Sequence, residues 1–143
     1  MMSHTNPNDD RLREILVDAK TIAMVGASNN ADKPSHRIMA QLLKAGYRVI
    51  PVNPKESEVL GQKAVASLAD IHEPVDIVDV FRRSEDTPPI ADEAAKLGAK
   101  TLWLQLGVTN DDAAARAEAK GLTVIMDKCI GATHHALGIA PKR

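Results

Sequence analysis

Five short apolar runs, each too short for a helix, alternate along the chain with segments of helical periodicity. The runs cover residues 21–25, 47–52, 75–81, 101–106 and 122–126. Strands of this length that are apolar throughout are typical of a parallel sheet with both faces covered. The alternation therefore predicts an α/β fold: a doubly wound, Rossmann-like parallel sheet of about five strands, with helices on both faces and right-handed crossovers.

The segments between the runs carry helix start and stop signals. Each has a polar residue able to cap the first turn, and glycine follows most of the last turns. We expect helices to begin after the cap cluster Asn8-Asp9-Asp10, at Ser35 as the cap, at Ser84 or Thr87, and after Asn110. Ser67 is expected to cap a single turn through Ile71, and the tail after Ile130 to form one short helix.

The length of 143 residues predicts one domain over 1–143, with an N-terminal helix in 1–20 and a C-terminal tail at 129–143. The single cysteine allows no internal disulfide, and no signal peptide or membrane span is evident, so we expect a soluble cytoplasmic protein with no membrane partner. A net charge of −1 and an aromatic content of 2% argue against a nucleic-acid partner, which would need a basic surface or stacking platforms.

In open α/β sheets, ligands bind outside the carboxyl ends of the strands. The loop between the first strand and the next helix contains Gly26, Ala27, Ser28 and Lys33. Backbone N–H groups at a helix N-terminus favour phosphate, so this loop is a candidate anion site. An ordinary turn with a capping serine is the alternative.

A dinucleotide-binding enzyme would show three glycines in this loop and a carboxylate after the second strand. The loop has one glycine, and the second strand is followed by Asn53 and Lys55. Lys33 and Lys55 could instead lie near a ribose phosphate, although surface lysines are common.

Two later strands place polar or aromatic residues at the same edge. Phe81 and Arg82 follow the third strand, where Phe81 contacts an apolar part of a ligand or only closes the core. Gln105 and Gly107 follow the fourth, where they approach a ligand or form a helix-entry turn.

Cys129 follows the fifth strand, with His134 and His135 close behind. A thiol nucleophile needs a nearby base, and a metal site needs three or four ligands. The spacing shows neither, so we assign no catalytic residue and no metal ligand, and a structural thiol is the alternative.

Six of these segments, taken in order, resemble the small stand-alone CoA-binding protein family, which is similar to the CoA-binding domain of the succinyl-CoA synthetase alpha subunit. The resemblance covers about residues 21–138. It is carried by VGAS at 25–28, KPS at 33–35, GYRVIPVNP at 46–54, VDIVDVFR at 75–82, WLQLG at 103–107 and DKC at 127–129.

The resemblance implies a Rossmann-like domain that binds coenzyme A (CoA) or an acyl-CoA. It implies that Gly26, Ala27 and Ser28 meet the CoA phosphates, that Asn53 and Lys55 meet the nucleotide end, and that Val80, Phe81 and Arg82 meet the next stretch. Lys33, Gln105 and Gly107 lie on the same rim. At that edge the Cys129 thiol could form a mixed disulfide with the CoA thiol.

The synthetase alpha subunit has a further domain with a phosphorylated histidine, for which a 143-residue chain has no room. His134 and His135 are therefore not given that role, and we expect binding without ligation. The alternatives are an NAD(P)-dependent oxidoreductase or other nucleotide-binding enzyme, and a domain that only presents an interaction surface.

Overall fold

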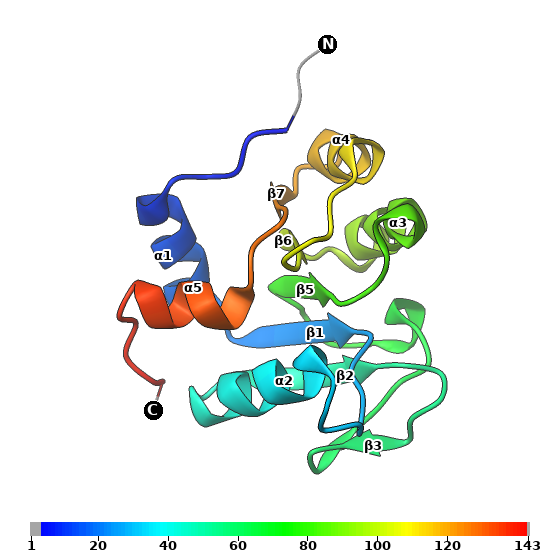
Figure 1. Cartoon of the computed structure of the whole chain (residues 1–143). Coiled ribbons are helices and arrows are strands. Elements are labelled where there is room, and N and C mark those ends of the chain that lie inside the picture. The colour runs from blue at the N-terminus through cyan, green and yellow to red at the C-terminus, as the bar shows by residue number, and fades with distance from the viewer. Residues whose placement is uncertain (1–3, 143) are drawn as a thin grey trace.

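A computed structural model describes residues 4–142. Residues 1–3 and 143, which the expected domain range includes, lie outside the described part. The sheet contains β1 (Thr21–Val25), β2 (Arg48–Val52), β5 (Ile77–Val80), β6 (Thr101–Leu104) and β7 (Thr123–Ile125). These five strands are parallel in the order β2-β1-β5-β6-β7 (Figure 1), which confirms the predicted fold class.

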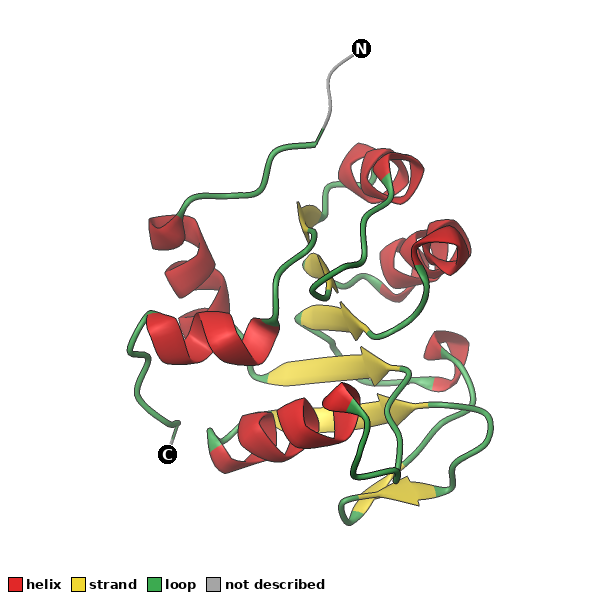
Figure 2. Cartoon of the chain, in the orientation of Figure 1, coloured by secondary structure: helices red, strands yellow, loops and turns green. Residues whose placement is uncertain are grey.

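Helices cover both faces of the sheet (Figure 2). One face carries α1 (Asp9–Asp18), α2 (Pro34–Lys44) and α5 (Ile130–Ala136). The other carries α3 (Thr87–Leu97) and α4 (Asp111–Ala119). Each face has its own apolar core, because the strand side chains alternate between the two faces. No helix in residues 4–142 is long and apolar enough to cross a membrane.

Chain connectivity places the switch point between β1 and β5. From β1 the chain crosses to β2 at one edge, and then returns to β5 on the other side of β1. The loops after β1 and β5 therefore diverge, and a crevice opens between them at the carboxyl edge. This crevice is where a ligand site is expected in such a fold.

The start of α2 differs from the expectation. Lys33 is the N-cap residue and Pro34 is the first helical residue, so the prediction that Ser35 caps this helix was wrong. Proline is favoured at this position, because its φ is preset and its missing N–H would have had no helical partner. Ser35 instead lies inside the first turn, and its side chain is buried.

Short elements fill the connection between β2 and β5. An antiparallel hairpin joins β3 (Glu58–Val59) to β4 (Gln62–Lys63) through Leu60 and Gly61, both at positive φ. A single 3-10 turn, Leu68–Asp70, follows with Ser67 as its cap, as predicted. Between the hairpin and this turn, the Val65 N–H donates to the Pro51 carbonyl and the Val65 carbonyl accepts from the Asn53 N–H, at the outer edge of β2.

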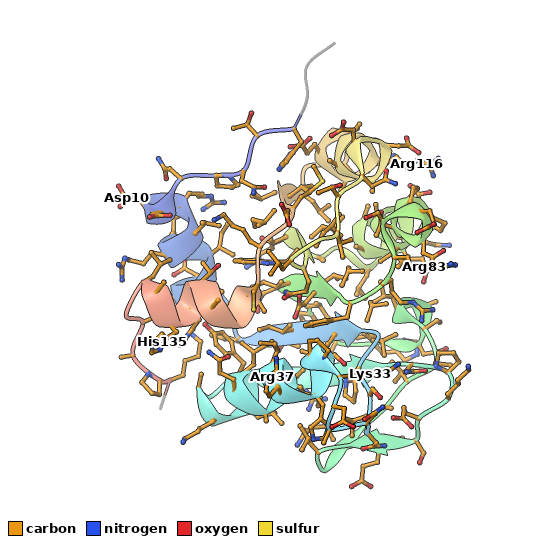
Figure 3. All side chains as sticks on the ribbon, in the orientation of Figure 1. Asp10, Lys33, Arg37, Arg83, Arg116 and His135 are labelled. Carbon is orange, nitrogen blue, oxygen red and sulfur yellow. The ribbon has the colours of Figure 1, made fainter. Side chains whose placement is uncertain are left out.

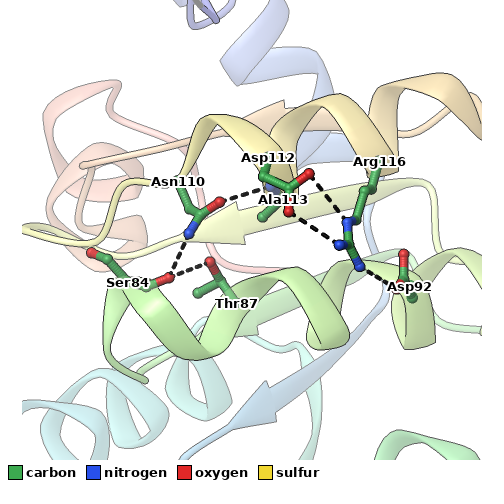
Figure 4. Close-up of polar contacts among 7 residues, drawn as sticks. All are labelled: Ser84, Thr87, Asp92, Asn110, Asp112, Ala113 and Arg116. Carbon is green, nitrogen blue, oxygen red and sulfur yellow. Dashed lines mark hydrogen bonds and ion pairs between the residues drawn. The ribbon is translucent and has the colours of Figure 1, made fainter.

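Helices α3 and α4 are joined by polar contacts (Figure 4). Asn110 caps α4 by accepting from the Ala113 N–H at 2.8 Å, and its Nδ2 donates to the Ser84 carbonyl at 2.9 Å. Farther along, Arg116 pairs with Asp92 of α3 at 2.8 Å. The α-helix begins at Thr87, the second of the two predicted starts, and a 3-10 turn, Ser84–Asp86, runs directly into it.

The chain ends pack against the domain. The Asn6 side chain donates to the Met126 carbonyl and accepts from the Met126 N–H, both at 2.8 Å, directly after β7. At the other end, Lys142 N–H donates to the Ala45 carbonyl at 2.7 Å, after α2.

Candidate ligand-binding site

A cavity of about 850 Å³ lies at the carboxyl edge of the sheet, beside the switch point. Its size is typical of small-molecule and cofactor sites, which run from roughly 300 to 1,000 Å³. Its lining comes from the start of α2 and from the ends of β1, β5, β6 and β7. The lining residues are Gly26, Lys33, Pro34, Ser35, Arg37, Ile38, Phe81, Arg82, Arg83, Asp86, Gln105, Leu106, Val108 and Cys129.

Basic side chains dominate the charge of this lining. Lys33 and Arg37 come from the start of α2, and Arg82 and Arg83 from the loop after β5 (labelled in Figure 3, except Arg82). Asp86 is the one acidic lining residue, and it pairs with Arg83 at 3.2 Å. Four basic groups against one carboxylate favour an anion, and guanidinium groups match phosphate geometry particularly well.

The start of α2 adds uncharged donors. Its N-cap residue, Lys33, makes no side-chain cap hydrogen bond, so the first-turn N–H groups lack that partner. Ser35 is 2% exposed, and its Oγ is buried with no hydrogen-bond partner in the described part of the chain. A buried hydroxyl without a partner is costly unless something else binds it. Together with the helix dipole, these groups form a site for an anionic ligand group.

Gly26 is required by packing as well as by position. Its φ is +91°, and a Cβ there would overlap the Phe81 carbonyl oxygen of the neighbouring loop. Its own N–H donates to the Val52 carbonyl at 3.0 Å, so this donor is already used. Gly26 therefore lets the loops after β1 and β5 approach each other, and any phosphate contact falls to later N–H groups.

Ala27 and Ser28 follow Gly26 and are almost fully buried outside the cavity lining. Within residues 4–142, neither backbone N–H donates a hydrogen bond to the protein, and the complete burial of Ala27 closes its N–H to a ligand. The Ser28 hydroxyl accepts from the Asn30 N–H at 3.0 Å, and this contact shapes the loop.

Asn53 and Lys55 lie after β2, outside the cavity lining. The Asn53 amide donates to the Ala27 carbonyl at 2.8 Å and accepts from the Lys55 N–H at 3.0 Å, so it ties two loops together. The Lys55 side chain is exposed. In the same loop, the Glu56 carboxylate accepts from the Asn29 N–H at 2.5 Å.

The ends of β5 and β6 place their residues differently. Phe81 is half-buried and lines the cavity, as do exposed Arg82 and buried Gln105. Val80 is fully buried in the core on the α3 face, and Gly107 lies outside the lining, with its N–H donating to Asp127 at 2.7 Å. Five of the predicted residues are thus brought together: Gly26, Lys33, Phe81, Arg82 and Gln105.

A buried carboxyl group lies beneath this wall. Asp79 of β5 is fully buried, and burial raises its pKa to about 8, although a hydrogen bond from Gln105 opposes the shift. Gln105 Nε2 donates to Asp79 Oδ1, while Gln105 Oε1 accepts from the Ile130 N–H at 3.3 Å. Asp79 is therefore protonated at neutral pH, and it links the cavity wall to the first residue of α5.

Cys129 lines the cavity, and its Sγ accepts from the Ala132 N–H at 3.4 Å. His134 packs edge-on against Tyr47 with ring centroids 5.9 Å apart. Burial, then the charges of Lys142 and His135, lower the His134 pKa, and its Nε2 has no partner among residues 4–142. In that part of the chain, no group of three or more His, Cys, Asp or Glu side chains is placed to hold a metal ion.

Several lining residues escaped the sequence reasoning. Arg37 lies in the first turn of α2 and is exposed, next to buried Ile38. A basic residue two positions after the expected cap, Ser35, was the available signal. Leu106 is 71% exposed on the rim, and nothing in the pattern of its strand distinguished it from a core residue.

The fold and this cavity define a Rossmann-like domain whose ligand site favours an anion. A comparison with family models gives the family, since the model described as "CoA binding domain" matches residues 20–135. The chain belongs to this family.

Relatives agree with this assignment. Uncharacterized protein YneT of Bacillus subtilis (strain 168) is 46% identical over 129 residues, spanning 90% of this chain and 96% of that protein. An acetate–CoA ligase (ADP-forming) of Methanocaldococcus jannaschii is 30% identical over 81 residues, which are 57% of this chain and 12% of the ligase. A solved structure of a hypothetical protein from Pyrococcus horikoshii OT3 superposes with a TM-score of 0.89, at 38% identity, covering 95% of this chain and 99% of that one.

Proposed function

We propose that this chain binds CoA or an acyl-CoA in the cavity at the carboxyl edge of its sheet. The observation that carries this proposal is the donor set of that cavity. Lys33, Arg37, Arg82 and Arg83 surround a space that also contains the partnerless Ser35 hydroxyl. CoA matches this set, because it joins a pyrophosphate and a ribose 3′-phosphate to a long uncharged arm that ends in a thiol.

The proposed roles follow the geometry. The pyrophosphate lies against the start of α2, where Ser35, Lys33 and the N–H group of Ser28 are the donors. Arg37, Arg82 and Arg83 neutralise the remaining phosphate charge. Phe81 and Gln105 contact the uncharged arm.

The residues outside the cavity are given supporting roles. Asn53 and Gly26 set the conformation of the loops through the contacts described above. Lys55 contacts the nucleotide end where the ligand extends past Ser28, and Gly107 and Val80 hold the β6 and β5 ends in place.

An NAD(P)-dependent oxidoreductase is the competing class. A ribose-binding carboxylate is expected at the end of the second strand in such enzymes, whereas Asn53 occupies this position. The carboxylate of Glu56 is already paired with the Asn29 N–H. A carboxylate at the position of Asn53 would also repel the 3′-phosphate of CoA. The amide at this position therefore favours CoA over NAD.

Ligation is not assigned to this chain. Its match covers 12% of the acetate–CoA ligase from M. jannaschii, so the remaining parts of that enzyme have no counterpart in the matched segment. We propose binding without catalysis by this chain alone.

Isothermal titration calorimetry with CoA, acetyl-CoA, dephospho-CoA, NAD and NADP tests the proposal. CoA or acetyl-CoA is expected to bind at least about tenfold more tightly than either dinucleotide, a difference of about 1.4 kcal/mol. Tighter binding of NAD or NADP would contradict it. Lys55→Ala is expected to weaken CoA more than dephospho-CoA, and equal losses would exclude a contact of Lys55 with the 3′-phosphate. Lys33→Ala is expected to weaken both ligands alike, because Lys33 is placed at the pyrophosphate that they share.

A further inference from the structure

The single thiol of this chain borders the proposed ligand cavity. Cys129 is half-buried and lies between the end of β7 and the start of α5. Its Sγ accepts from the Ala132 N–H at 3.4 Å, and its carbonyl accepts from Thr133 Oγ1 at 2.9 Å. These contacts fix the sulfur at one place on the cavity wall.

A separate observation shows that this wall faces a ligand site. Ser35, from α2, lines the same cavity, is 2% exposed and has a buried Oγ with no partner among residues 4–142. Such a hydroxyl indicates that a polar group of a ligand completes its hydrogen bonding. Cys129 and Ser35 therefore border the same ligand space, contributed by elements far apart in the sequence.

The residues that directly follow Cys129 are tied to the end of β6 and to α2. Gln105 Oε1 accepts from the Ile130 N–H at 3.3 Å, and Gln41 of α2 donates to the Gly131 carbonyl at 2.9 Å. The start of α5, which Cys129 caps, is thus tied to Gln105 after β6 and to Gln41 of α2. When the phosphates of a ligand bind the basic side chains, its uncharged arm is free to occupy the side of the cavity next to Cys129.

We propose that Cys129 is a site of thiol–disulfide exchange. When CoA disulfide is present, Cys129 reacts with it and holds one CoA as a mixed disulfide. This inference rests on the proposed CoA binding. The Cys129 thiolate attacks one sulfur of the symmetrical CoA disulfide. The bond between the two CoA sulfurs breaks, and a bond between Sγ and one CoA sulfur forms. The second CoA leaves as a thiolate and takes up a proton in place of the one Cys129 lost, so one disulfide replaces another.

The absence of a second cysteine determines the fate of this adduct. The chain has one cysteine, so no neighbouring thiol of its own can displace the bound CoA. The mixed disulfide persists until an external thiol attacks it. Selectivity then comes from the basic side chains, because anchoring raises the effective concentration of the disulfide at Cys129.

Intact-mass spectrometry tests this proposal on the folded protein. The reduced chain is incubated with CoA disulfide or, separately, with glutathione disulfide at the same concentration. We expect addition of one CoA moiety, at least about tenfold faster than addition of glutathione. Cys129→Ser is expected to give no adduct. Arg37→Ala is expected to slow the CoA reaction toward the glutathione rate, and protein unfolded in urea should show no preference.

Calorimetry with reduced CoA, in the presence of a reductant, separates the two proposals. If reduced CoA binds in calorimetry but CoA disulfide leaves Cys129 unmodified in the mass-spectrometry experiment, the exchange site is wrong and the proposed function stands. Equal rates with both disulfides would likewise overturn the exchange site, since the reaction would then need no anchoring. If reduced CoA does not bind, the proposed function itself fails.

Discussion

Asp79 is an acidic residue in an apolar environment. It lies in the middle of an apolar sheet with one hydrogen-bond partner, Gln105, and its second oxygen has none in the described part of the chain. An ionised carboxylate there would be very costly, so the group stays protonated. Through Gln105, this neutral acid holds the first N–H of α5.

This protonation makes stability depend on pH. The pKa of Asp79 rises from 3.8 in the unfolded chain to about 8 in the folded one, so the folded state binds more protons between these values. Its contribution is complete below pH 3.8 and is lost as pH rises toward 8, with a slope of up to about 1.4 kcal/mol per pH unit.

Asp79→Asn should remove that slope. Urea unfolding of both proteins from pH 5 to pH 9 is the measurement, and we expect the variant to gain stability relative to the parent as pH rises to 8. The opposite dependence from His134, whose pKa is lowered, cancels in the comparison because both proteins contain it. A difference that does not change with pH would mean that Asp79 is already ionised near neutrality.

Arg37 is the residue of the cavity that most directly tests the proposed phosphate site. Arg37→Ala is expected to weaken CoA binding by about 1.5–3 kcal/mol, the usual range for a hydrogen bond to a charged group. Arg13→Ala is the matched control, because this substitution removes the same charge from an exposed position on α1, outside the cavity lining. Calorimetry at low and at physiological salt distinguishes the two positions, and equal losses would indicate only a general effect of charge.

At the scale of elements, the cap of α4 has two functions. Asn110 accepts from the Ala113 N–H and also donates to the Ser84 carbonyl before α3. It therefore starts one helix and fixes that helix against its neighbour. Asn8 caps α1 by accepting from the Arg11 N–H at 3.0 Å, and makes no bond to another helix within residues 4–142.

The two caps can be compared directly. Asn8→Ala is expected to cost about 1 kcal/mol, and Asn110→Ala more, about 2 kcal/mol, because the Ser84 carbonyl also loses its partner. Denaturant unfolding of the two variants measures both free energies. Equal losses would show that the contact between α3 and α4 adds nothing to the cap.

The elements were largely predictable and the cavity only partly so. Apolar runs and caps are local, which is why the five strands and the starts of α1 and α4 follow from the sequence. The start of α2 was not predicted, because Ser35 and Pro34 both give start signals. In the structure Pro34 is the first helical residue and Ser35 is buried inside the first turn. The site depends on which loops meet. Arg37 and Leu106 join the cavity through tertiary packing that no local pattern records.

For the whole molecule, ligand binding should appear as added stability. A ligand that binds only the folded state stabilises it by RT ln(1 + [L]/Kd), or about 2.7 kcal/mol at 100 times Kd. For a domain of this size that is a rise in Tm of roughly 5–10 °C. Thermal unfolding with CoA, and with NAD as the control, measures it. No shift with CoA at concentrations far above 1 mM would contradict the proposed function.

The two outer strands of the sheet, β2 and β7, each have a further segment of the chain beside one end. Open sheet edges recruit strands from other molecules. Here the Val65 backbone pairs along β2, and the Asn6 side chain imitates a strand backbone by bonding both the N–H and the carbonyl of Met126 after β7. We expect these contacts to hinder edge-to-edge pairing between copies, and on the β7 side that effect depends on a segment that precedes the first helix.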